Sequence, residues 1–87
     1  MSNLTVTQER IDYLMDTAVF DVRTTLEKCT VVTAQLENGF ILVEASACVD
    51  PANYDQDMGE SICKEHMRSR LWELEGYALQ KAVYEGK

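Results

Sequence analysis

The chain has 87 residues, with eight basic against fifteen acidic side chains and a formal net charge of -7. This length allows one domain with a modest core, so residues 1–87 are expected to form a single domain. The acidic balance argues against a general DNA- or RNA-binding protein, although a few local cations could still hold a small anionic ligand. Three cysteines without C-x-x-C spacing, no apolar leader and no membrane-spanning run favour a reduced cytosolic compartment.

The first predicted element is a helix near the N-terminus. Residues Thr5-Val6-Thr7-Gln8 have the form of a capping box. The apolar residues that follow at helical spacing are Ile11, Leu14, Met15, Ala18 and Val22. This pattern predicts a helix of roughly four to five turns that fades at the β-branched pair Thr24-Thr25.

A β-hairpin is predicted over residues 30–47, with Asn38-Gly39 in a two-residue type I′ turn. This turn sets Leu36 opposite Ile41, Ala34 opposite Val43, Val32 opposite Ala45 and Thr30 opposite Ala47. One face of the hairpin is then almost wholly apolar, while the other carries Phe40, Leu42 and Val31 among polar residues. Because a lone hairpin is marginal in water and both faces are partly apolar, we expect an obligate assembly.

A long helix is predicted from about residue 55 to residue 85. Asp50 before Pro51 favours a short helical turn first, and either Asn53 or Asp55 can cap the long helix. One apolar stripe comprises Cys63, Met67, Leu71, Leu74, Ala78 and Ala82, and a second comprises Trp72, Gly76, Leu79 and Val83. The second stripe would stay exposed on a monomer, which favours self-association. The alternative is a helix buried on two sides within one subunit.

No constellation of residues in this sequence argues for catalysis. His66 is the only histidine, and with Cys63 it supplies too few ligands for a metal site. Glu73 and Glu75 point to different sides of a helix, so they cannot act as a carboxylate pair. No glycine-rich phosphate loop or nucleophile elbow is present. We therefore expect a protein that is not an enzyme and that uses neither a metal nor a cofactor.

Several basic and aromatic side chains could instead hold an anionic ligand. Tyr13 offers a ring for stacking on a base, and Lys28 precedes the first strand of the predicted hairpin. Arg68 shares a helix face with Lys64, whereas Arg70 points about half a turn away. On composition alone, such residues are most often ordinary surface groups.

Four segments carry a resemblance to a known family of small phage proteins. They are TVVTA at 30–34, NGF at 38–40, CVDPANYD at 48–55 and LWELEGYALQ at 71–80. In this order they resemble the anti-CBASS protein 2 family of cyclic-oligonucleotide sponges, and the resemblance covers roughly residues 8–80. It implies an α+β, mainly α fold, with an N-terminal helix, a hairpin and a long C-terminal helix, straight or kinked, interlocked in a homohexamer.

The resemblance also implies a function and a set of site residues. Proteins of this family bind cyclic dinucleotides and trinucleotides without cleaving them, and this sequestration blocks activation of CBASS immune effectors in the host bacterial cytoplasm. The family's dinucleotide pocket matches Tyr13 and Lys28. Its separate trinucleotide pocket matches Thr30 and an arginine upstream of the tryptophan, for which both Arg68 and Arg70 are candidates. No DNA, RNA or membrane partner is expected.

A different class of function is also consistent with the composition. An acidic protein could inhibit a host factor by mimicking the charge of nucleic acid. Against this alternative, the acidic residues are scattered along the chain instead of lining one face. We therefore favour the sponge.

Overall fold

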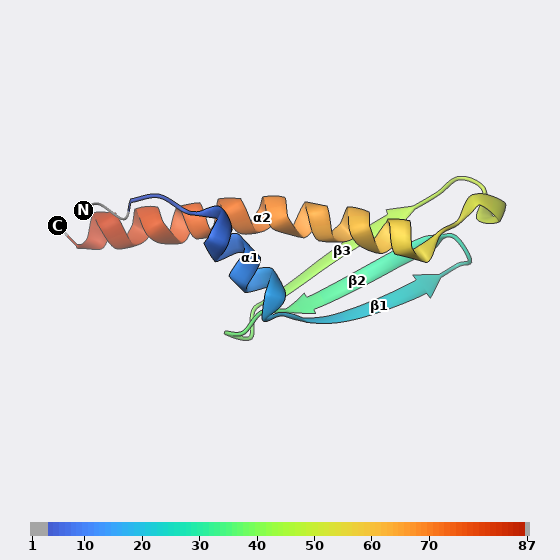
Figure 1. Ribbon diagram of the computed structural model, residues 1–87, viewed down its shortest axis with the longest axis horizontal. Helices are drawn as coiled ribbons and strands as arrows, with labels where there is room; N and C mark the ends of the chain where they lie inside the picture. Colours follow the sequence, from blue (N-terminus) through green and yellow to red (C-terminus); the bar gives the residue numbers. More distant parts are fainter. Residues whose placement is uncertain (1–3, 87) are drawn as a thin grey trace.

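The fold is α+β, as predicted, with a long helix packed along one face of an antiparallel sheet (Figure 1). The computed structural model describes residues 4–86. Its elements in chain order are α1 (Gln8–Asp16), β1 (Val19–Thr25), β2 (Cys29–Gln35), β3 (Ile41–Ala47), the short 3-10 helix η1 (Pro51–Asn53) and α2 (Gln56–Glu85). The strands lie in the order β1-β2-β3, so β2 is central and β1 and β3 form the edges.

The core lies between the sheet, α1 and α2. The buried apolar side chains are Ile11, Leu14 and Met15 from α1, Val32, Ala34, Leu36 and Leu42 from the sheet region, and Cys63, Met67 and Leu71 from α2. The spacing of four residues in α2 and of two in β2 is the periodicity of one buried helix face and one buried strand face. The buried side chains of α2 are the first three members of its first predicted stripe.

The predicted first helix is too long in comparison with the structure. α1 ends at Asp16, and residues Val19–Thr25 form strand β1, which pairs with β2. Val22 fits a helical pattern, but along β1 the half-buried Phe20 and Val22 alternate with exposed neighbours. That two-residue period is typical of a strand. The sheet therefore has three strands instead of the predicted two.

The hairpin is confirmed, but its predicted register is wrong by one residue. Thr30 lies opposite Ser46 and Ala34 opposite Leu42. The Leu36 N–H donates to the Phe40 carbonyl at 2.8 Å, and Gly39 has a φ of +94°. Three residues, 37–39, thus form the loop, and the glycine occupies its left-handed position.

This one-residue shift changes which side chains of β3 face the core. Leu42 is buried, whereas Ile41 and Val43, predicted on the apolar inner face, are about half exposed on the outer face. The outer face of the sheet consequently carries exposed apolar side chains. Exposed apolar surface of this kind favours association with another chain, although it does not define the partner.

The long helix is confirmed close to its predicted bounds. Asp50 caps η1, and the Asp55 carboxylate caps α2 by accepting from the backbone N–H of Asp57 and Met58. At the usual rises, a 30-residue helix is about 45 Å long and a seven-residue strand about 23 Å. The C-terminal part of α2 therefore extends beyond the sheet, as Figure 1 shows, and Leu74 and Trp72 stay partly exposed.

Candidate functional site

Tyr13 lies on α1 beside the turn between β2 and β3, where it has a charged neighbour of each sign. Its side chain is 44% exposed, and its hydroxyl donates a hydrogen bond to Oε1 of Glu37 at 2.7 Å. This bond, and the repulsion of a phenolate by the carboxylate, raise the pKa of Tyr13 above its ordinary value of 10.0. The Arg10 guanidinium lies 5.7 Å from the ring centroid and pairs with Glu75 at 3.0 Å. The ring is thus an accessible stacking surface next to a cation and an anion.

Lys28 lies in the turn between β1 and β2, directly before the first residue of β2. In the same turn, Leu26 and Glu27 have positive φ values of 53° and 66°, which are uncommon for residues other than glycine. The Lys28 ammonium donates to the backbone carbonyl of Val49 at 3.1 Å. In the described part of the chain, no carboxylate forms an ion pair with Lys28, so its charge is available to an external anion.

The two predicted dinucleotide-binding residues lie at opposite ends of β2. Tyr13 contacts Glu37, two residues after the last residue of this strand, whereas Lys28 immediately precedes the first one. A seven-residue strand spans about 23 Å. One copy of the chain therefore does not bring Tyr13 and Lys28 together, and a small ligand that contacts both would have to lie between two copies.

Thr30 is fully buried beneath the start of α2. Its Oγ1 lies 2.6 Å from the hydroxyl of Tyr54, which is also 2.8 Å from Oγ1 of Thr24. Gln56, the first residue of α2, donates to the same Thr24 oxygen at 3.0 Å. On the other side, Gly59 packs directly on Thr30 because it has no side chain. Within one chain the Thr30 hydroxyl is therefore covered, and a ligand could reach it only after Tyr54 moves.

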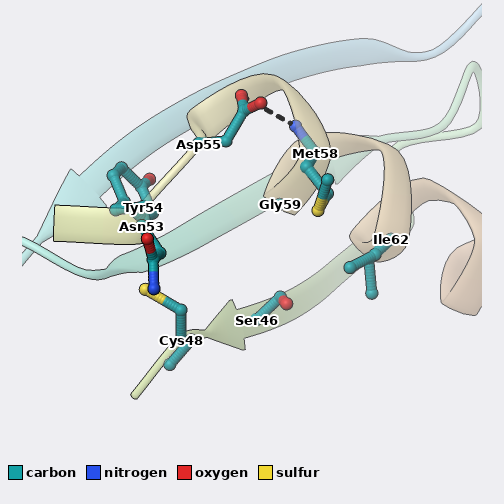
Figure 2. A pocket seen from close by; sticks show the side chains of 9 residues that line it. Ser46, Cys48, Asn53, Tyr54, Asp55, Met58, Gly59 and Ile62 are labelled. Atoms are coloured by element: carbon teal, nitrogen blue, oxygen red, sulfur yellow. Dashed lines mark hydrogen bonds between the residues drawn. The ribbon is translucent and has the colours of Figure 1, made fainter. Parts of the chain in front are cut away.

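A small hollow of about 100 Å³ opens beside this junction (Figure 2). Figure 2 shows Ser46 from β3 and Cys48, the first residue after that strand, on one side and Met58 and Ile62 from α2 on the other, with Asp55 above. Among the residues that the structure describes, no basic side chain lines this hollow. With an aspartate at its rim, the hollow is poorly suited to an anionic ligand.

The two candidate arginines point to different elements, and each already has an acidic partner. Arg68 pairs with Asp12 of α1 at 2.7 Å, and this hydrogen bond holds the pKa of Asp12 below its ordinary value. Arg70 pairs with Glu44 of β3 at 3.1 Å. Neither guanidinium forms a hydrogen bond with Thr30 in the described residues. Within one chain, the Thr30 hydroxyl is thus engaged by Tyr54 and each arginine by a carboxylate.

Arg68 nevertheless has an environment that Arg70 lacks. It lines an open hollow of about 490 Å³ between α1 and α2, together with Trp72 one helical turn further on and the carboxylates of Asp12 and Glu65. Unlike the hollow beside Thr30, this one therefore contains a cation that offsets part of its negative charge. Trp72 is 39% exposed. A guanidinium and an indole at i and i+4 on one helix face can bind a phosphate and stack on a base, respectively.

Three neighbours of the predicted residues were not predicted from the sequence. Arg10 precedes Tyr13 by three residues on the same helix, so helical spacing could have indicated it. Trp72 follows Arg68 by four residues, so helical spacing could have indicated it as well. Glu37 has no such signal, because its contact with Tyr13 joins residues 24 positions apart.

The fold and the sequence define a small acidic α+β protein. The chain belongs to the Phage protein (N4 Gp49/phage Sf6 gene 66) family, which matches residues 6–83. No curated protein and no solved structure matches the chain. Among residues 4–86, no cluster of His, Cys, Asp or Glu could hold a metal ion, and no helix is long and apolar enough to cross a membrane.

Proposed function

We propose that this phage protein is a sponge for cyclic oligonucleotides. It binds cyclic dinucleotides and trinucleotides without cleaving them, and so keeps them from activating CBASS immune effectors in the host bacterial cytoplasm. Membership of a phage protein family supports this proposal. The resemblance of four segments to the anti-CBASS protein 2 family adds to it. The observation that carries it is the combination of an exposed aromatic ring at Tyr13 with the half-buried Lys28, whose ammonium pairs with no carboxylate within residues 4–86.

In the proposed dinucleotide site, Tyr13 stacks on a base and Lys28 contacts the anionic phosphodiester ring. Stacking on an aromatic ring is worth about 1–3 kcal/mol per base. Because these residues lie at opposite ends of β2, we place Tyr13 of one subunit next to Lys28 of its partner. The exposed apolar side chains of Ile41 and Val43, and those on the projecting end of α2, are available to hold the subunits of a homohexamer together.

In the proposed trinucleotide site, Arg68 is the better candidate of the two arginines. It shares its hollow with the stacking surface of Trp72. Its guanidinium would exchange Asp12 for a ligand phosphate, which arginine can contact through two parallel hydrogen bonds. Thr30 would contribute its hydroxyl only after Tyr54 moves away from it.

The test is to mix the purified protein with a cyclic dinucleotide, measure binding by calorimetry, denature the complex and analyse the released nucleotide by mass spectrometry. We expect saturable binding and recovery of the intact cyclic ligand. The corresponding linear dinucleotide serves as the control ligand, and Tyr13→Ala as the control variant. Absence of binding would contradict the proposal and favour the nucleic-acid mimic, and recovery of a linearised product would show an enzyme instead of a sponge.

A further inference from the structure

Glu37 is a carboxylate at the edge of the tyrosine that the proposed function assigns to base stacking. A negative charge is unfavourable beside an anionic phosphodiester ring, so its presence there needs a reason. Its single partner within residues 4–86 is the Tyr13 hydroxyl, which bonds to Oε1 at 2.7 Å. Oε2 has no hydrogen-bond partner in that part of the chain, and both residues are exposed. Glu37 is therefore free to accept hydrogen bonds from a ligand.

The position of Glu37 relative to the ring determines which part of a ligand it can contact. A phenolic oxygen lies in the plane of its ring, so a carboxylate bonded to it lies at the edge of the stacking surface. A base stacked on Tyr13 would project its own edge toward that carboxylate, whereas its phosphates would lie further away. Proteins commonly combine stacking on an aromatic ring with hydrogen bonds to the Watson–Crick edge of the same base.

We propose that Glu37 is a specificity-determining residue that selects guanine over adenine in the base stacked on Tyr13, an inference that rests on the proposed function. The Watson–Crick edge of guanine presents two adjacent donors, the N1–H and the N2 amino group, and a carboxylate accepts from both. Adenine presents an acceptor, N1, at the corresponding position and would be repelled. The Glu37 charge thus favours the base edge that is rich in donors.

The experiment compares calorimetric affinities for cyclic di-GMP and cyclic di-AMP in the unmutated protein and in three variants. Glu37→Gln still accepts from the Tyr13 hydroxyl, so the ring keeps its place, but an amide donor replaces one acceptor. We expect the unmutated protein to prefer cyclic di-GMP and Glu37→Gln to lose about tenfold or more of that preference. Glu73→Gln, the same change of charge at an exposed position on α2, should leave the preference unaltered. Tyr13→Phe should also retain it, since the carboxylate remains.

Each contrary result has a distinct meaning. A preference of the unmutated protein for cyclic di-AMP, or an unchanged ratio of affinities in Glu37→Gln, overturns the role of Glu37 while leaving the sponge intact. Loss of the preference in Tyr13→Phe to the same extent as in Glu37→Gln also overturns it, because Glu37 would then act only by orienting the ring. Failure of the unmutated protein to bind either ligand overturns the proposed function itself.

Discussion

Gly59→Ala should destabilise the protein, although alanine is the better helix former. Gly59 lies in the first part of α2, where the helix rests on Thr30 of the central strand. A Cβ at this position would lie 2.7 Å from the Thr30 Cβ and closer still to its hydroxyl oxygen. Because the Thr30 Cβ is attached directly to the backbone of a central strand, rotation of the side chain cannot relieve the contact.

The expected change in the free energy of unfolding combines one stabilising effect with two destabilising effects. Replacing glycine by alanine within a helix stabilises it by about 1 kcal/mol. Overpacking a close contact costs about 1–3 kcal/mol, and displacing the Thr30 hydroxyl weakens its bond to Tyr54, worth about 0.5–1.5 kcal/mol. We expect a net loss of roughly 0.5–3.5 kcal/mol in the free energy of unfolding.

Urea unfolding followed by circular dichroism measures this change, at one fixed protein concentration because self-association would shift the midpoint. Ser61→Ala is the control: it lies two residues further along the same helix, at an exposed position, and also replaces a residue of lower helix propensity by alanine. It should stabilise the protein by up to about 0.7 kcal/mol. Stabilisation by both substitutions would refute the close packing of α2 on Thr30.

Four further measurements test the proposed sites and the assembly. Tyr13→Ala should weaken cyclic dinucleotide binding by about 1–3 kcal/mol and Lys28→Ala by about 1.5–3 kcal/mol; unchanged affinities in both folded variants would mean that the pocket lies elsewhere. Arg68→Gln should weaken trinucleotide binding more than Arg70→Gln does, with dinucleotide affinity retained in both; the opposite order would remove the role given to Arg68. Because Glu37 raises the pKa of Tyr13, their hydrogen bond contributes its full stability below pH 10.0 and loses it as the pH rises through the raised pKa. An ultraviolet titration should show tyrosinate forming at lower pH in Glu37→Gln. Light scattering at micromolar concentration should give several times the monomer mass, and a clean monomer would exclude the pockets between subunits.

The sequence predicted best those elements that begin at a capping residue or meet at a characteristic turn dipeptide. The start of η1 was predicted from Asp50 before Pro51, and the start of α2 from Asp55 before the helical pattern. Both predictions lie close to the observed bounds. Asn38-Gly39 likewise identified the turn between β2 and β3. Its loop length could not be inferred, because an Asn-Gly pair suits both a two-residue loop and a three-residue loop with glycine in the left-handed position.

The strand β1 was missed because Val22 satisfies two periodicities at once. It continues the helical spacing of Met15 and Ala18, and it also alternates with Asp21 and Arg23 as a strand residue. Pairing with β2 decides between these readings, and that contact depends on residues elsewhere in the chain.

The candidate site residues remain predictions from the sequence, and the side chains that they contact in the fold could not be predicted from it. The bonds from Tyr13 to Glu37, from Arg68 to Asp12 and from Thr30 to Tyr54 all join different elements of the fold. Such long-range contacts decide whether a side chain is available to a ligand. The burial of Thr30 and the separation of Tyr13 from Lys28 therefore required the structure.

The most direct test of the central claim, a dinucleotide pocket built from two subunits, is a complementation measurement. In an assembly made only of Tyr13→Ala subunits, every pocket lacks the tyrosine. In one made only of Lys28→Ala subunits, every pocket lacks the lysine. Unfolding the two variants together and refolding them as a mixture should restore about a quarter of the pockets, namely those that combine an intact Tyr13 from one copy with an intact Lys28 from its partner. We predict that calorimetry of the mixture detects this fraction of sites with the Kd of the unmutated protein. A mixture that binds no better than either variant alone would contradict the shared pocket.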